Sequence, residues 1–83
     1  MVHGDVQGVG FRWWTARQAE RLDVRGWVAN RDDGTVEVHA EGDAVAVDAL
    51  VSALQEGPRF ARVARVVVAE EDPGGWATFQ VEP

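Results

Sequence analysis

The chain has 83 residues and a formal net charge of −6, with eight arginines and neither lysine nor cysteine. This length allows one domain with a small core, folded in at most two packed layers. The missing cysteine and lysine exclude a disulfide framework, a thiolate zinc site, a cysteine nucleophile and Schiff-base chemistry. The acidic balance argues against sequence-independent nucleic-acid binding, and no apolar run reaches the ~20 residues of a membrane span. The absence of cysteine also agrees with a cytoplasmic location.

The first part of the chain predicts a short strand, a glycine-rich loop and a helix. Residues 4–10 hold three glycines in seven positions, which is typical of a loop with unusual backbone conformations. A helical face follows, because apolar or small residues recur every three or four positions: Phe11, Trp14, Thr15, Ala19 and Leu22. A loop that leads into a helix implies a preceding strand, and only residues 1–3 stand before the loop.

A hairpin is predicted next. Residues 26–30 contain aromatic and β-branched members that favour a strand, and Asp33-Gly34 is a strong hairpin signal. Residues 36–41 then alternate apolar and polar side chains, which indicates a strand with one buried and one solvated face. We expect His39 to be exposed on the solvated face.

The second half of the chain completes a regular pattern. Asp43 can cap a helix that ends at Gly57-Pro58, with an apolar stripe along it: Val47, Leu50, Val51 and Leu54. A valine-rich strand over 62–69, a turn over 72–75 and a short strand over 76–81 follow. The order predicts an α+β fold, the ferredoxin-like β-α-β-β-α-β two-layer sandwich, with an antiparallel sheet and a short extra C-terminal strand.

This fold would bring two distant segments together. With the third strand between the first two, Asn30 lies at the same sheet edge as the glycine-rich loop, roughly 10 Å away. The free amides and positive dipole at the N-terminus of the helix favour an anion there. Arg12 in the first helical turn is unfavourable for the dipole, but its planar fork matches phosphate oxygens. The loop and Arg12 therefore indicate an anion site, although a purely structural turn stays an alternative.

Two segments resemble the signatures of the acylphosphatase family. Residues 4–12, GDVQGVGFR, followed by Thr15, resemble the phosphate loop of these enzymes. Residues 26–36, GWVANRDDGTV, resemble their second signature, and residues 75–79 fit their closing strand. The resemblance covers essentially the whole chain, so we expect a single acylphosphatase-like domain over residues 1–83.

The resemblance implies hydrolysis of the carboxyl-phosphate bond of acyl phosphates to a carboxylate and inorganic phosphate. By matching position it implies two catalytic residues: Arg12, which would bind the transferring phosphate, and Asn30, which would orient the attacking water. It also implies a set of phosphate-binding backbone amides: Gly8, Val9, Gly10, Phe11 and Arg12. No metal or other cofactor is expected. The expected partners are a small-molecule acyl phosphate and inorganic phosphate as product and inhibitor, with no nucleic acid, no membrane and a monomeric state.

Other functions fit the same fold. A binding module would hold phosphate without turnover, and Asp5, at a position often basic in the family, favours it. An RNA-binding domain would need exposed aromatic side chains on its central strands, and residues 36–41 contain none. A piece of a larger carbamoyl-phosphate-processing maturation enzyme is a third alternative, against which the missing cysteine zinc motifs argue.

Several side chains also have structural interpretations. Asn30 precedes a turn and is a common turn residue. His3 is either a strand residue or a base, and Asp32 and Asp33 are interpreted as a solvated hairpin rather than as metal ligands. Trp13 is expected to be partly exposed and to border the acyl group. Core packing is predicted for the remaining tryptophans: Trp14, Trp27 and Trp76.

Overall fold

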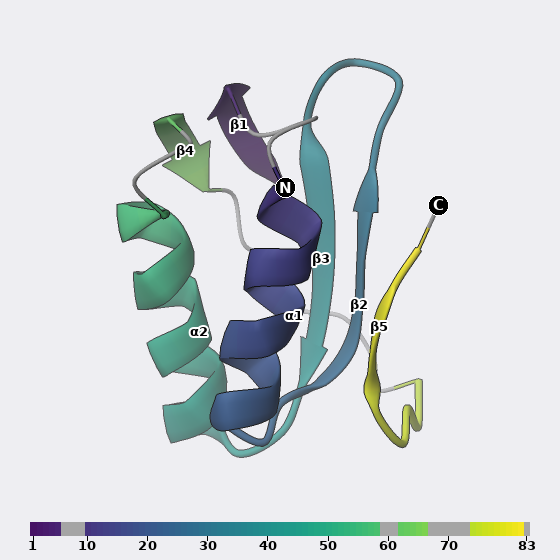
Figure 1. Ribbon diagram of the computed structural model, residues 1–83. Helices are drawn as coiled ribbons and strands as arrows, with labels where there is room; N and C mark the ends of the chain where they lie inside the picture. The colour runs from purple at the N-terminus through teal and green to yellow at the C-terminus, as the bar shows by residue number, and fades with distance from the viewer. Residues whose placement is uncertain (6–9, 59–61, 67–73, 83) are drawn as a thin grey trace.

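A computed structural model describes residues 1–5, 10–58, 62–66 and 74–82 of the chain (Figure 1). Two helices lie on one face of a five-stranded sheet. The elements in chain order are β1 (Val2–Asp5), α1 (Phe11–Arg21), β2 (Arg25–Asn30), β3 (Val36–Glu41), α2 (Ala44–Glu56), β4 (Arg62–Val66) and β5 (Phe79–Val81).

The sheet has the strand order β4-β1-β3-β2-β5, so β3 lies between β1 and β2 as predicted. The pairs β1–β3, β1–β4 and β2–β3 are antiparallel, which gives the ferredoxin-like arrangement. The extra strand β5 pairs parallel to β2, and it therefore makes the sheet mixed. The predicted fold class is confirmed, and the C-terminal strand lies directly beside the strand that carries Asn30.

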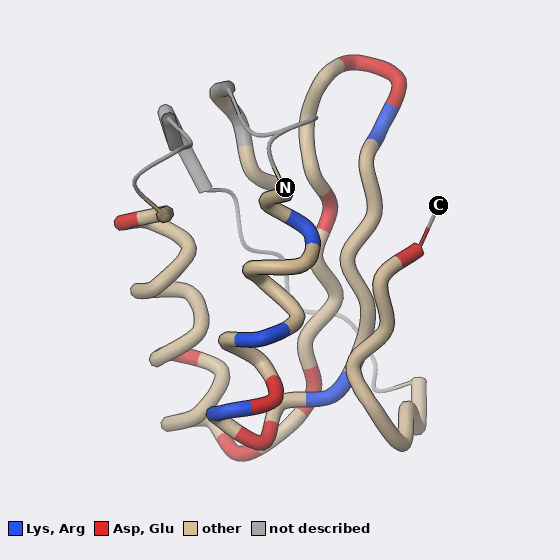
Figure 2. Tube along the Cα trace, in the orientation of Figure 1, with Lys and Arg blue, Asp and Glu red and all other residues tan. Residues whose placement is uncertain are grey.

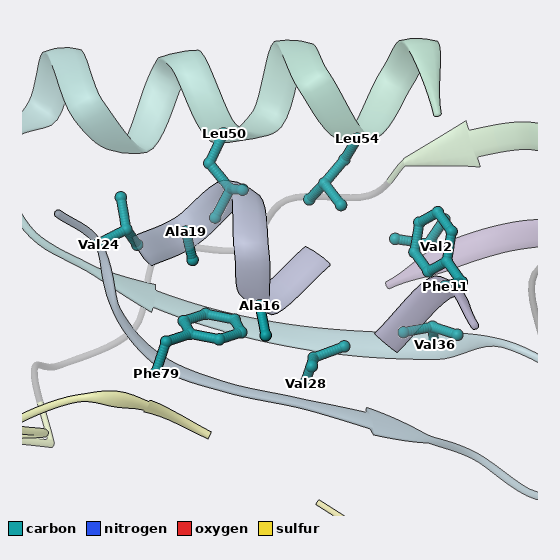
Figure 3. Packing of buried hydrophobic residues seen from close by; sticks show 10 residues of the cluster. All are labelled: Val2, Phe11, Ala16, Ala19, Val24, Val28, Val36, Leu50, Leu54 and Phe79. Carbon is teal, nitrogen blue, oxygen red and sulfur yellow. The ribbon is translucent and has the colours of Figure 1, made fainter. Parts of the chain in front are cut away.

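The core lies between the helices and the sheet (Figure 3). Phe11 and Ala19 of α1, and Leu50 and Leu54 of α2, point into it because they follow the three- and four-residue spacing of a helical face. Val28 contributes from the sheet side and is fully buried. Trp14 packs at the margin of this cluster. The helical stripes predicted from the sequence therefore form the contact between the two layers.

The first strand is longer than predicted, because it continues through Gly4 to Asp5. Its pairing with β4 shifts register between His3 and Gly4, where Gly4 adopts a φ of 129°. A glycine tolerates this irregular strand geometry, so the residue that suggested a loop is a bulge position within the strand. His3 is a strand residue, and the segment 6–9 lies outside the described residues.

The open face of the sheet differs from the prediction at two positions. Only 12% of the His39 side chain is exposed, because its ring stacks on Trp27 at a centroid distance of 5.9 Å. Trp27 alternates with the buried Val28 and pairs across the strands with His39, so its indole lies on the open face and not in the core. Trp76 is half-buried and also lies outside the described core cluster.

The start of the second helix follows its sequence signal in part. Asp43 occupies the N-cap position of α2, but its side chain makes no capping hydrogen bond. After α1, Asp23 adopts a left-handed φ of 58°, a conformation that aspartate tolerates better than most residues. The strand predicted over 62–69 is β4 up to Val66, and its last three residues lie outside the described chain. No helix in the described chain is long and apolar enough to cross a membrane.

Candidate functional site

The N-terminus of α1 has the properties of an anion site. Gly10 occupies the N-cap position with a φ of 80°, and as a glycine it offers no side chain to cap the first turn. The first turn contains no acidic residue, whereas Arg12 lies within it. The helix as a whole carries three arginines and one glutamate (Figure 2), so it is cationic in a chain of net charge −6. Uncapped amides and a neighbouring guanidinium favour an anionic group at this end.

Arg12 is connected to the C-terminal strand. Its Nη1 donates a hydrogen bond of 2.5 Å to the backbone carbonyl of Glu82, and the Glu82 amide donates to the Val28 carbonyl at 2.8 Å. Val28 stands two residues before Asn30 on β2. Since a guanidinium has five N–H donors, the bond to Glu82 fixes the orientation of Arg12 with one of them.

Asn30 is the last residue of β2 and pairs with Val36 of β3. Its side-chain oxygen Oδ1 is buried and has no hydrogen-bond partner among the described residues. The adjoining turn is closed by other groups, because Asp33 Oδ1 accepts from the amide and the hydroxyl of Thr35 at 3.0 and 2.6 Å. Among the described residues, the Oδ1 atom of Asn30 therefore accepts no hydrogen bond that would explain this residue as turn chemistry.

The predicted site residues stand on two elements. Arg12 is linked through Glu82 to Val28 of β2, the strand that ends at Asn30, and Gly10 and Phe11 begin α1. Gly8 and Val9 lie outside the described residues. No sequence signal marked Glu82, because a backbone carbonyl acts here whatever its side chain is.

Trp13 lies beside this site and is 67% exposed, as its position in the helix suggested. It borders a shallow groove of about 490 Å³ between α1 and β5. The groove is lined by Trp13, Ala16, Arg17, Glu20, Phe79, Gln80 and Val81. A role for Trp13 beside the acyl group stays a prediction.

Metal ligands do not gather in the described part of the chain. No group of three or more histidine and carboxylate side chains lies close enough there to hold an ion. Asp32 and Asp33 are exposed in the β2–β3 turn, and Asp33 is used in closing it. The sequence predicts turnover without a metal ion, and activity measured in the presence of a chelator tests this prediction.

The strand order and the two helices on one face define a small ferredoxin-like sandwich, and the N-terminus of α1 is a place that favours an anion. The acylphosphatase family model matches residues 1–81, and the chain belongs to the acylphosphatase family. It is therefore an acyl-phosphate hydrolase whose substrate is a small-molecule acyl phosphate.

Individual relatives agree with this assignment. An acylphosphatase of Thermococcus kodakarensis is 51% identical over 80 residues, which cover 96% of this chain and 88% of the relative. The crystal structure of acylphosphatase from Bacillus subtilis matches with a TM-score of 0.93 at 38% identity, covering 99% of this chain and 92% of that one. An acylphosphatase structure from Coxiella burnetii matches with a TM-score of 0.85 at 38% identity, covering 98% and 85% of the two chains.

Proposed function

We propose that this acylphosphatase holds the phosphate of its substrate with Arg12 and the backbone amides of Gly8 to Arg12, and that Asn30 orients the attacking water. The observation that carries the proposal is the buried Asn30 Oδ1, which lacks a hydrogen-bond partner among the described residues. A buried polar atom without a partner costs free energy, so a native protein that keeps one commonly uses it for a ligand or water.

Charge and geometry at the start of α1 support the binding of phosphate there. The uncapped first turn of α1 offers amide donors and the positive end of the helix dipole. Arg12 adds a planar fork that can contact two phosphate oxygens at once. Its bond to the Glu82 carbonyl limits the conformations that the side chain must give up when a phosphate binds.

The chemical step needs a positioned water more than it needs an acid. The water oxygen attacks phosphorus while the bond from phosphorus to the acyl oxygen breaks, and the carboxylate leaves. A carboxylate is a stable leaving group, since its conjugate acid has a pKa near ~4. Phosphoryl transfer is mostly positioning and charge stabilisation, so the amides and one arginine can suffice. A phosphate oxygen of the substrate accepts the proton that the water gives up.

Asn30 suits the orienting task because its carbonyl oxygen accepts a hydrogen bond from water. A neutral amide also avoids placing a negative charge beside an anionic substrate. These groups require neither a metal nor another cofactor. We propose that residues 1–83 form one monomeric domain, which releases inorganic phosphate as its product and is competitively inhibited by it.

The experiment compares the wild type with Asn30→Ala in phosphate release from benzoyl phosphate. We expect kcat to fall ~100-fold, because the orientation of the water is lost. The inhibition constant of inorganic phosphate stays nearly unchanged, because Arg12 and the loop amides are intact. Asn30→Asp, which keeps the size and an acceptor, weakens phosphate binding as well because it adds a negative charge. A folded Asn30→Ala enzyme that retains most of its kcat contradicts the assignment of Asn30.

A further inference from the structure

A carboxylate on the open face of the sheet is enclosed by backbone amides from a distant segment. Glu41, the last residue of β3, accepts hydrogen bonds through Oε1 from the amides of Gly75 and Trp76 at 3.1 and 3.3 Å. Its Oε2 accepts from the amide of Gly74. Three consecutive amides thus converge on one side chain that stands more than thirty positions earlier in the chain.

His39 completes this cluster. Its Nε2 donates to Glu41 Oε2 at 2.6 Å, and its ring is held by stacking on Trp27. Only 8% of the Glu41 side chain is exposed. The hydrogen bonds from His39 and from the Gly74 amide lower the pKa of Glu41 below its ordinary value, so the carboxylate is the favoured form.

The segment that Glu41 binds leads directly into β5. The amide of Gly26 donates to the Thr78 carbonyl at 3.0 Å at the start of this pairing, and the Glu82 amide donates to Val28 at its end. Between them β5 is only three residues long and pairs with β2 alone in the described sheet. So short an edge strand has few bonds of its own to fix its register along β2.

The register of β5 matters because Arg12 bonds to the carbonyl of Glu82, the residue that follows this strand. A slip by one residue moves a backbone group along a strand by about 3.3 Å, which would take the Glu82 carbonyl out of hydrogen-bond reach of Arg12. A bond at the start of the segment therefore determines a contact at its end, next to the phosphate-binding guanidinium.

We propose that Glu41, oriented by His39, is a positioning residue for Arg12: it fixes residues 74–76, hence the register of β5 and the Glu82 carbonyl that orients the guanidinium. The inference rests on the proposed role of Arg12 in binding phosphate. Glu41 itself touches neither substrate nor the reacting atoms, since it lies on the open face at the far end of β3 from the hairpin.

The test measures the inhibition constant of inorganic phosphate and kcat/KM for benzoyl phosphate in Glu41→Gln. We expect both to worsen by about tenfold, because a misplaced binding group loses much of its advantage. Glu37→Gln is the matched control, since Glu37 is a carboxylate on the same strand and face but pairs with Arg31. In this control the phosphate inhibition constant changes by less than about twofold.

A double-mutant cycle separates positioning from general loss of stability. If Glu41 acts through Arg12, Glu41→Gln adds no further loss of phosphate binding in an Arg12→Ala background. Hydrogen exchange supplies a direct readout, because the Glu82 amide that bonds to Val28 loses protection in Glu41→Gln while the β2–β3 amides keep theirs.

His39→Phe and His39→Gln keep the test decisive if Glu41→Gln does not fold. Phenylalanine preserves stacking on Trp27 but cannot donate to Glu41, so phosphate binding weakens; glutamine keeps a donor and restores it in part. Normal phosphate inhibition in folded Glu41→Gln and His39→Phe overturns the inference, as does an additive effect with Arg12→Ala. Normal phosphate inhibition in Arg12→Ala overturns the proposed role of Arg12 as well, so the two failures are distinguishable.

Discussion

Arg12 is an arginine where helix electrostatics disfavour a cation. A positive side chain in the first turn opposes the helix dipole by about 0.3–1 kcal/mol. The side chain is nevertheless held in a fixed contact with the Glu82 carbonyl. A bound phosphate, as we propose, would reverse the sign of this balance, because the guanidinium and the positive end of the dipole would then face an anion.

Arg12→Lys keeps the charge but removes the planar fork that we propose contacts two phosphate oxygens. Losing one charge-assisted hydrogen bond costs about 1.5–3 kcal/mol, so we expect turnover and phosphate inhibition each to weaken roughly tenfold or more. The measurement is the phosphate inhibition constant together with kcat/KM for benzoyl phosphate. Phosphate inhibition equal to that of the wild type would show that Arg12 does not touch the phosphate.

The buried hydroxyl of Thr15 gives a prediction about stability. Its side chain is fully buried, and its hydroxyl Oγ1 has no hydrogen-bond partner among the described residues. Valine has nearly the same shape without the unsatisfied oxygen, so Thr15→Val should raise the free energy of unfolding by about 1 kcal/mol. Urea unfolding measures the change. A loss of stability would indicate that the hydroxyl has a partner, for example an ordered water.

At the scale of elements, the β2–β3 pair depends on Gly26. Its φ is 138°, and a Cβ added there would lie 1.8 Å from the backbone oxygen of His39. The neighbouring strand cannot move aside without breaking the pairing that carries Asn30. Gly26→Ala should therefore destabilise the protein by about 3 kcal/mol or more. Thermal unfolding by circular dichroism tests this, with Gly34→Ala in the open turn as a comparison, since nothing lies within 4 Å of a Cβ at Gly34.

The elements were predicted well where apolar residues recur with a clear period. They were predicted less well where the assignment depended on one residue type that occurs in two structural settings. The helical stripes and the alternation along β3 correctly gave the two layers. Gly4 suggested a loop but is a strand bulge, because glycine serves both. Trp27 suggested the core, yet its ring covers His39 on the open face. Such pairing across strands depends on register, which composition does not specify.

In the site, too, features that depend on local patterns were predicted, whereas contacts between distant segments were not. Arg12 and Asn30 were singled out because they stand in local motifs, and the strand order agrees with the expectation that Asn30 ends a strand separated from β1 by β3 alone. Their roles stay a proposal. The contacts of Glu82 and Glu41 could not be predicted, since each joins segments more than thirty residues apart through backbone groups that any residue carries.

The lowered pKa of Glu41 makes the stability of the folded protein depend on pH. The pKa of this residue is lowered in the folded protein from an ordinary value of 4.5, through hydrogen bonds from His39 and the Gly74 amide, while Arg25 is its cross-strand neighbour. The unfolded state then binds more protons at Glu41 than the folded state does. The contribution of the Glu41 carboxylate to the free energy of unfolding is therefore fully present above about pH 4.5, and it is lost as the pH falls through the pKa of the folded protein.

Melting temperatures of the wild type and Glu41→Gln between about pH 7 and pH 3 measure this effect. The difference in melting temperature between the two proteins should be constant toward about pH 7 and should become smaller below about pH 4.5. A difference that stays constant down to the acid end would mean that Glu41 does not contribute as a carboxylate.

We propose that Arg12, Asn30 and the loop amides hydrolyse an acyl phosphate without a metal. The decisive experiment measures phosphate release from benzoyl phosphate by the wild-type enzyme after exhaustive treatment with EDTA. We expect the same kcat with and without the chelator, because the proposed groups stabilise the transferring phosphate themselves. Loss of turnover in EDTA that a divalent ion restores would contradict this proposal.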